Sequence, residues 1–343
     1  MNAMAPPPAK APLLSVRGLT VTFRRGGRAF KAVEDVDFDV EPGETLGLVG
    51  ESGSGKTTIG RALLRLLPRG GGDVGGSIVY DGQDLLALGE GALRAKRGEL
   101  QMIFQDPVSS FNPRRQVQDI VGEGLEIRGV PKAERRRLVE AALADVGFKL
   151  ASVEGRRPHQ FSGGQCQRIA IARALAVGPR LIVCDEPVAS LDVSVQAQVL
   201  NLLQDIRETR RLALIFISHD LAVVRNVSDR VAVLYMGRIV EIGPGDALYA
   251  RPAHPYTRML LEAVPVPDPA FRPVPAVRAA SEMPSRLTPP SGCRFRTRCP
   301  RAQSVCAAEE PKLAPGPRGQ EVACHFPHDE PAPGLAAHQE TAP

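Results

Sequence analysis

The sequence lacks any apolar run long enough to cross a membrane. A spanning helix needs about 18 consecutive apolar residues, and Arg, Asp or Glu interrupts every candidate in this 343-residue chain. The sequence also lacks the apolar segment of a signal peptide, because residues 1–12 contain four prolines. We therefore expect a cytoplasmic protein that does not span the membrane by itself, with a disordered leader at residues 1–12.

The chain also has little excess of one charge. It contains 43 Lys and Arg against 38 Asp and Glu, so its formal net charge is +5 and its isoelectric point is about 9.0. Both signs are mixed along the chain, so charge gives no support to a nucleic-acid partner. Hydrophobic residues make up 43% of the sequence, which is enough to bury a sizeable core and excludes disorder for most of the chain.

Proline and cysteine divide the chain near residue 261. Residues 13–260 carry 11 of the 31 prolines, whereas the last 83 residues carry 16. Cys166 and Cys184 lie in the first part, and the other four cysteines lie in the tail. We therefore predict one domain at 13–260 and a small Cys-rich extension at 261–343.

Residues 13–260 alternate β-rich runs with helical patterns, which is typical of an α/β domain. Short apolar runs predict buried parallel strands at Thr45–Val49, Leu181–Asp185 and Ala213–Ile217. Helical spacing predicts helices at 56–67, 138–146 and Gly163–Ala176. Residues 14–23 and 33–40 alternate apolar and polar side chains, as half-buried antiparallel strands do. The predicted fold has a parallel-sheet core, an antiparallel β layer and a helical subdomain.

A phosphate-binding loop lies between the first of these strands and the first helix. Residues 50–57 read Gly-Glu-Ser-Gly-Ser-Gly-Lys-Thr and match the pattern GxxxxGK[ST]. The glycines let successive backbone N–H groups converge on phosphate oxygens, and the helix N-terminus adds a favourable dipole. Lys56 would pair with the β and γ phosphates of ATP, and Thr57 would ligate Mg²⁺. The predicted nucleotide contacts are Gly50, Ser52, Gly53, Ser54, Gly55, Lys56, Thr57 and Thr58.

Further segments carry polar groups suited to ATP chemistry. Residues 161–165 begin a helix with two glycines, where an anion could approach the backbone. The strand Leu181–Asp185 ends in paired carboxylates, of which Asp185 suits Mg²⁺ and Glu186 suits a base that orients water. Asp192 and His219 follow in two later polar segments.

In this order, the motifs resemble the ATP-binding subunit of an ABC transporter across residues 13–260. The resemblance implies that Gln105 senses the γ phosphate, ligates Mg²⁺ and couples to the membrane subunits. It also implies that His219 is the switch histidine and that Asp192 lies in the loop between two ATP sites. The implied signature, which meets ATP bound to the opposite subunit, consists of Ser162, Gly163, Gly164 and Gln165.

The same resemblance suggests an adenine contact and shows two departures. Phe23 falls where the family places an aromatic ring against adenine, and Phe30 is a second candidate. Phe161 replaces the usual leucine of the signature, which should be tolerated. Cys166 stands where related sequences usually have arginine, so the contact made by that arginine is in doubt.

Several stretches resemble the subfamily that imports dipeptides and oligopeptides, closest to its F-type ATPase subunit. They are residues 104–107, 111–114, 184–187, 254–257 and 263–265, with 289–293 and 298–300 in the extension. The resemblance implies a second ATPase subunit of the D type, two transmembrane permeases, an extracytoplasmic solute-binding protein and a place at the cytoplasmic face of the membrane. Relatives carry nickel, glutathione and other small solutes, so the cargo stays open between peptides and these.

The cysteines of the tail follow the pattern C-x5-C-x6-C-x17-C: Cys293, Cys299, Cys306 and Cys324. In a cytosolic chain, clustered thiols indicate a metal or a cluster before disulfides. Structural zinc usually pairs its cysteines two to four residues apart, so the wider spacing favours an iron–sulfur cluster, aided by nearby arginines. The subfamily resemblance also implies [4Fe-4S], while zinc and unligated thiols remain alternatives. Cys184, inside an apolar run, is better explained by strand packing.

Two other classes of protein share the ATP-binding motifs. A soluble ABC ATPase acting on DNA or ribosomes commonly fuses two ATPase domains or inserts long heptad coils, and this sequence shows neither. A degenerate subunit would bind ATP without hydrolysing it, which the presence of Glu186 and His219 disfavours. With one set of motifs per chain, we predict an active dimer.

Overall fold

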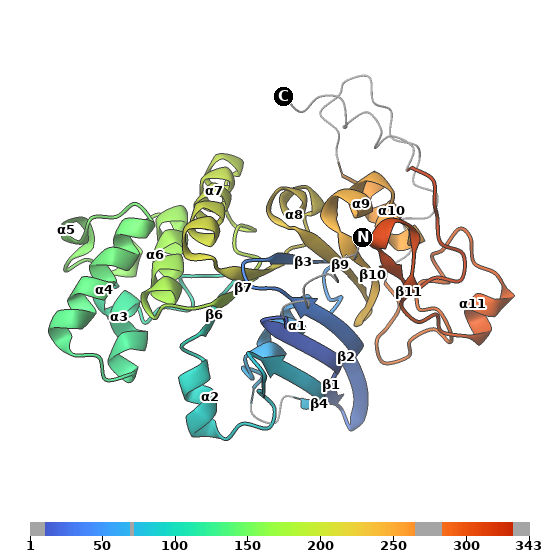
Figure 1. Ribbon diagram of the computed structural model, residues 1–343, viewed down its shortest axis with the longest axis horizontal. Coiled ribbons are helices and arrows are strands. Elements are labelled where there is room, and N and C mark those ends of the chain that lie inside the picture. The colour runs from blue at the N-terminus through green and yellow to red at the C-terminus, as the bar shows by residue number, and fades with distance from the viewer. Residues whose placement is uncertain (1–10, 69–71, 265–282, 332–343) are drawn as a thin grey trace, which may run out of the picture.

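The structure is a computed structural model that describes residues 11–68, 72–264 and 283–331. The predicted leader lies outside these ranges except for residues 11 and 12. The chain forms two sheets, a helical arm on one side and a C-terminal segment on the other (Figure 1).

The N-terminal residues form a four-stranded antiparallel sheet of order β2-β1-β4-β5, as the alternating pattern predicts. One face of β1 and β2 is buried and the other is polar, so this sheet is an outer layer with one face packed on the core and one face toward solvent. The strands are β1 (Leu14–Arg25), β2 (Arg28–Val40), β4 (Asp73–Tyr80) and β5 (Gln83–Asp84).

The second sheet has eight strands in the order β11-β12-β10-β9-β3-β8-β7-β6. From β9 to β6 all neighbours are parallel, whereas β10, β12 and β11 are added antiparallel. Every residue of β3, β7 and β8 is buried, as expected for central strands covered on both faces. The strands are β3 (Thr45–Val49), β6 (Leu100–Ile103), β7 (Leu181–Asp185), β8 (Ala213–Ile217), β9 (Arg230–Tyr235), β10 (Arg238–Pro244), β11 (Ala314–Pro315) and β12 (Glu321–Val322).

Helices form the predicted arm and cover the large sheet (Figure 1). The arm consists of α3 (Val117–Ile127), α4 (Lys132–Asp145), α5 (Leu150–Val153) and α6 (Gly163–Ala176), with α7 (Val193–Arg210) beside it. The other helices are α1 (Lys56–Leu63), α2 (Glu90–Lys96), α8 (Leu221–Val227), α9 (Gly245–Ala250), α10 (Pro255–Glu262) and α11 (Ser304–Ala308), with short 3-10 turns at Pro158–Gln160 and Pro317–Gly319.

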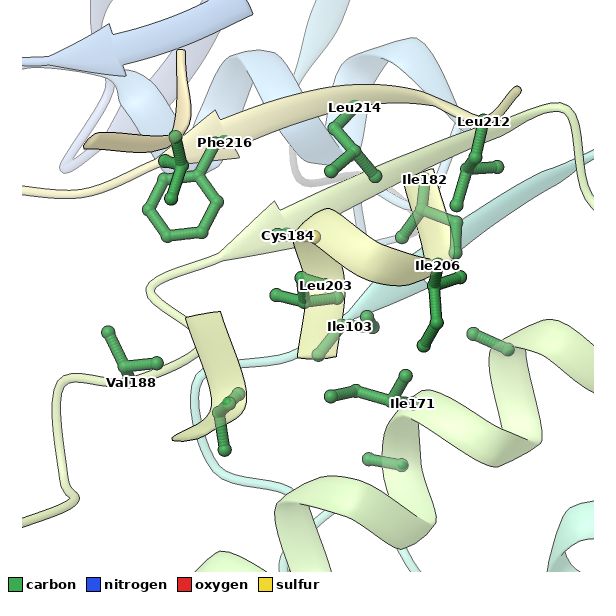
Figure 2. Close-up of a cluster of buried hydrophobic side chains, with 14 of the residues drawn as sticks. Ile103, Ile171, Ile182, Cys184, Val188, Leu203, Ile206, Leu212, Leu214 and Phe216 are labelled. Atoms are coloured by element: carbon green, nitrogen blue, oxygen red, sulfur yellow. The ribbon is translucent and has the colours of Figure 1, made fainter. Parts of the chain in front are cut away.

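A hydrophobic core joins the arm to the parallel strands (Figure 2). Ile171 on α6 and Leu203 on α7 point toward the sheet and belong to one buried cluster with Ile182 and Phe216 of its strands. Cys184 lies in this cluster with its side chain fully buried, and burial raises the pKa of its thiol to about 12. The prediction that Cys184 is a packing residue is therefore confirmed.

Several predicted boundaries were wrong. The helix predicted at 138–146 is α4, which begins at Lys132, and strands β1 and β2 extend beyond the predicted ranges 14–23 and 33–40. Helix α1 ends at Leu63 rather than at residue 67. Arg65 adopts a left-handed conformation (φ 50°), and the amide of Leu66 donates back to the Arg61 carbonyl, which closes the helix. Pro68 follows and could not have continued it.

The C-terminal segment is joined to the large sheet by backbone hydrogen bonds. Strand β12 pairs with β10 through Glu241 and Ile242, and the amide of Ala323 donates to the Val240 carbonyl. Helix α10 crosses the predicted boundary at 260/261. In the described ranges no helix combines the length and apolar character needed to cross a membrane.

Candidate active site

The loop after β3 has a backbone that requires glycine at both ends. Gly50 has φ 149°, and a Cβ there would lie 2.2 Å from the Leu234 carbonyl oxygen. Gly55, the N-cap of α1, has φ 119°, and a Cβ there would lie 2.9 Å from the Ala32 carbonyl oxygen. Any side chain at these positions would push the loop away from β9 and β2.

Hydrogen bonds from outside the loop hold this backbone in place. Gly237 donates its amide to the Ser54 carbonyl at 2.8 Å, and the amide of Glu51 donates to the Tyr256 hydroxyl at 2.9 Å. Lys56 is buried, and its Nζ donates to the carbonyls of Gly50 and Glu51 at 2.7 and 3.2 Å. The ammonium thus lies inside the curve of the loop, where phosphate oxygens would meet it.

Thr57 and Asp185 form a pair of oxygen ligands beside Lys56. The Thr57 hydroxyl, in the first turn of α1, donates to Asp185 Oδ1 at 2.8 Å across to the end of β7. Asp185 is almost fully buried, and burial raises the pKa of its carboxyl above the usual range. A nearby cation would stabilise the ionised form of this buried carboxylate. The hydroxyl and the carboxylate together fit Mg²⁺, which prefers oxygen ligands.

Three predicted residues meet at the ends of β6, β7 and β8. The Gln105 amide donates from Nε2 to Glu186 Oε2 at 3.0 Å, and His219 Nδ1 lies 3.3 Å from Glu186 Oε1. Glu186 itself has φ 48°, in the left-handed region, and its amide donates to the Ile217 carbonyl. The carboxyl ends of adjacent parallel strands place all three side chains at one edge of the sheet.

The predicted signature lies elsewhere in the chain. Ser162 caps α6: its hydroxyl accepts from the Gln165 amide at 3.4 Å, and Gln165 Oε1 accepts from the Ser162 amide at 3.0 Å. Gly164 touches α7, because a Cβ there would lie 2.4 Å from Val195 Cγ1. Figure 1 shows α6 in the arm on the left, apart from α1 at the centre, so the helix that begins with the signature and the helix that follows the glycine-rich loop lie in different parts of the molecule. Asp192 caps α7 without a side-chain cap bond.

The remaining predicted positions are less closely tied to this site. Phe23 and Phe30 lie opposite each other on β1 and β2 with ring centroids 5.9 Å apart, so both candidates for the adenine contact share one place. Phe161 packs against Phe148 and under Arg156, whose guanidinium lies 4.1 Å from its ring centroid. Cys166 is buried in the arm, with its Sγ 3.6 Å from the Pro158 carbonyl, so it makes no surface contact of the kind an arginine would make.

The four cysteines of the tail converge. Cys293, Cys299, Cys306 and Cys324 all line one small pocket of about 10 Å³ between the C-terminal segment and the start of α10. Burial raises the pKa of Cys293, Cys299 and Cys324, the last to about 11. Within the described ranges, however, no group of three or more His, Cys, Asp or Glu side chains is arranged so that it could hold a metal ion.

The arginines among these cysteines have other partners than the thiols. Arg294 pairs with Glu34 on β2, and Arg298 forms a two-pronged ion pair with Glu51 in the glycine-rich loop. Arg296 bonds to Ser291 within the tail. The charges of Arg294 and Arg298 are therefore directed at carboxylates of residues 13–260, contrary to the expectation that they would serve a cluster.

Sequence reasoning missed two residues that contact the glycine-rich loop. Tyr256 and Arg298 both bond to Glu51, although they lie 205 and 247 residues from it. Both stand in stretches that carry the subfamily resemblance, but nothing in those stretches indicates a contact with this loop.

Comparison with known proteins agrees with this geometry. Residues 33–189 match the family model described as "ABC transporter", and residues 240–306 match "Oligopeptide/dipeptide transporter, C-terminal region". The chain is 49% identical over 316 residues, 92% of its length and 98% of the relative's, to a Brucella ovis protein named provisionally as a peptide import ATP-binding protein. It is 48% identical over 85% of its length to the Escherichia coli oligopeptide transport ATP-binding protein OppF, covering 86% of that chain.

Solved structures show the same fold. The dimeric ATP-binding cassette MJ0796, in a post-hydrolysis state bound to ADP and Pi, superposes with a TM-score of 0.60 at 26% identity. The match covers 67% of this chain and 98% of that one. A second likeness, to cbiO1 of Clostridium perfringens, has a TM-score of 0.61 at 24% identity and covers 69% of this chain and 90% of that one.

Proposed function

Since the chain belongs to the ABC transporter ATP-binding family, in the branch with the oligopeptide/dipeptide-transporter C-terminal region, we propose that it powers the import of dipeptides and oligopeptides. The chain is an ATPase of the ABC type. The observation that carries its chemistry is the meeting of Glu186 with Gln105 and His219, beside the Thr57–Asp185 pair.

Each side chain has a role that its position supports. The backbone amides of the loop and Lys56 bind the β and γ phosphates, and Phe23 stacks on adenine, with Phe30 behind it. Thr57, Asp185 and Gln105 would hold Mg²⁺, which neutralises charge on the phosphates. Glu186 orients the attacking water and takes its proton, and His219 and Gln105 hold the Glu186 carboxylate in place through the contacts described above.

The active unit is proposed to be a head-to-tail dimer of ATPase subunits. Ser162, Gly163, Gly164 and Gln165 are exposed or half-buried at the start of α6, which lies in the arm apart from α1. A second subunit would therefore bring a signature to each ATP. Asp192, exposed or half-buried at the start of α7, would lie between the two sites. The γ phosphate adds contacts only in the closed dimer, so ATP binding favours closure and hydrolysis releases it.

The rest of the assembly follows from the family. We propose a D-type ATPase as the second subunit, two transmembrane permeases, an extracytoplasmic solute-binding protein and a peripheral position at the cytoplasmic face of the membrane. Residues 13–260 would form the ATPase domain and residues 261–343 the Cys-rich extension, with α10 spanning the boundary between them.

We further propose that the four tail cysteines hold a [4Fe-4S] cluster. The donor set fits, because four thiols line one pocket and burial makes three of them costly to ionise without a cation nearby.

The test of the main proposal uses the complete transporter. The chain would be purified with its permeases and partner ATPase, reconstituted into vesicles, and supplied with ATP and labelled oligopeptides in the presence of the binding protein. We expect ATP-dependent peptide uptake that disappears with Lys56→Ala, because the ammonium facing the phosphates is lost. Uptake of nickel or glutathione without peptide uptake would reassign the cargo, and absence of ATP hydrolysis in the wild type would contradict the assigned chemistry.

A further inference from the structure

Glu51 of the glycine-rich loop carries a negative charge next to the site where a triphosphate binds. Its carboxylate accepts two hydrogen bonds from Arg298: Nη1 to Oε2 at 2.7 Å and Nη2 to Oε1 at 2.8 Å. This fork geometry is the strongest form of carboxylate recognition by a side chain. The Arg298 side chain is 4% exposed and the Glu51 side chain 30% exposed, so water reaches the pair from the Glu51 side and screens it only in part.

Aromatic packing fixes the segment that presents Arg298. Phe295 is fully buried, and its ring centroid lies 5.3 Å from those of both Tyr235 and Tyr256. The amide of Arg298 donates to the Phe295 carbonyl at 2.9 Å, which closes a turn between them. Tyr256 in turn accepts the amide hydrogen of Glu51. The side chain and the main chain of Glu51 are therefore both held from the C-terminal side.

The position of Glu51 matters to the rest of the loop. Its carbonyl accepts from Lys56 Nζ, and the Ser54 amide donates to the same carbonyl. A carboxylate without a countercharge at this position would repel the phosphates at short range. A rotated Glu51 would also move the main-chain groups that orient Lys56.

We propose that Arg298, from the cysteine-bearing segment, is a positioning residue for ATP: it neutralises Glu51 and holds it turned away from the phosphates. The C-terminal segment thereby becomes part of the support of the nucleotide site. This inference rests on the proposed ATP binding by residues 50–58.

The test measures the affinity of the full-length protein for ATP with Mg²⁺ by calorimetry, in wild type, Arg298→Gln, Glu51→Gln and the double variant. Partners that orient metal ligands are worth about 10- to 100-fold in metal affinity or activity. Arg298 orients Glu51 in a comparable way, so we expect Arg298→Gln to weaken ATP binding by about 10-fold. The double variant should recover most of this loss, because it removes the uncompensated charge. A merely structural role for Arg298 predicts no such recovery.

The matched control is Arg296→Gln, in the same segment, whose side chain bonds to Ser291 rather than to the glycine-rich loop in the part of the chain that the structure describes. It should bind ATP as the wild type does. Arg298→Lys keeps the charge without the fork and should fall between wild type and Arg298→Gln, which keeps the test valid if Arg298→Gln does not fold. Unchanged affinity in the folded Arg298 variants, an equal loss in Arg296→Gln, or no recovery in the double variant would overturn the inference. Failure of the wild type to bind ATP would instead contradict the proposed function.

Discussion

At the scale of residues, Glu186 has the most constrained geometry in the site. Its left-handed backbone (φ 48°) is unfavourable for a side chain with a Cβ, and such strain is retained where the surrounding structure enforces it. Here the bond to the Ile217 carbonyl and the contacts with Gln105 and His219 supply that enforcement. The result is a carboxylate held at the end of β7 between two polar side chains.

Glu186→Gln tests the role of this carboxylate as the base. The carboxamide fills the same space but cannot take a proton from water, so turnover should fall by several orders of magnitude while ATP affinity stays near that of the wild type. The variant should accumulate as ATP-bound dimers, detectable by size-exclusion chromatography. Glu208→Gln on the exposed side of α7 is the control and should hydrolyse ATP normally. Turnover of Glu186→Gln close to wild type would remove Glu186 from this role.

At the scale of elements, the sequence pattern predicts the strands and helices whose packing gives them one regular spacing of apolar residues. The strands β3, β7 and β8 and the helix α6 have the predicted bounds, because central strands are continuous apolar runs and α6 opens with a capping box. The end of α1 was missed because it depends on the left-handed conformation of Arg65. An arginine gives no sequence signal for that conformation, as a glycine would. Strands β11 and β12 have two residues each and exist only because β10 offers an edge.

The junction between β10 and α10 contains a buried acid that should give the fold a pH dependence. Glu241 is fully buried and accepts the amide hydrogens of Ala253 and His254, and burial raises the pKa of its carboxyl from 4.5 to about 6. A raised pKa in the folded state means that the stabilisation is complete below pH 4.5 and is lost as the pH rises through about 6. Ionisation of Glu241 should therefore cost the fold about 2 kcal/mol by pH 7, on the order set by the size of the shift.

Glu241→Gln isolates this effect, since the amide keeps the volume and one acceptor but does not ionise. The difference in free energy of unfolding between variant and wild type, from urea titrations, should shift in favour of the variant between pH 4.5 and pH 7. The same difference for Glu208→Gln, whose side chain is exposed, should change much less. A difference for Glu241→Gln that does not change with pH would mean that Glu241 titrates at its ordinary value.

At the scale of the whole molecule, the sequence predicts two separate parts, whereas the structure shows contacts between them. Composition predicts an ATPase domain and a Cys-rich extension that share no ligands. In the structure β12 extends the large sheet, and Arg298 contacts the glycine-rich loop. Such contacts cannot be predicted from the sequence pattern. Glu51 and Arg298 lie in separate motifs, and their separation along the chain does not indicate how close they are in space. The convergence of Thr57 with Asp185 could be predicted, since Thr57 follows β3 and Asp185 ends β7 of one parallel sheet.

The proposed cluster at the four tail cysteines predicts the iron and sulfide content of the purified protein. Prepared without oxygen, the protein should be brown and contain about four iron and four sulfide per chain, as ligation of a cubane by four thiolates implies. Cys166→Ser, which changes a buried thiol of the arm, is the control and should keep the iron. Stoichiometric zinc without sulfide would contradict the cluster, and a folded, metal-free tail would contradict both metals.

Cys299→Ser tests whether the state of the cysteine-bearing segment reaches the ATP site. Residue 299 directly follows Arg298, so loss of a ligand there should loosen the turn that presents the guanidinium to Glu51. We expect iron content to fall and ATP affinity to weaken, by less than the about 10-fold expected for removing a supporting contact outright. In the Arg298→Gln background the same change should still remove iron but should weaken ATP binding no further, because the connection is already broken. Equal losses of affinity in both backgrounds would mean that the cysteines act on the nucleotide site by another path, and an unchanged affinity in both would mean that the two sites are independent.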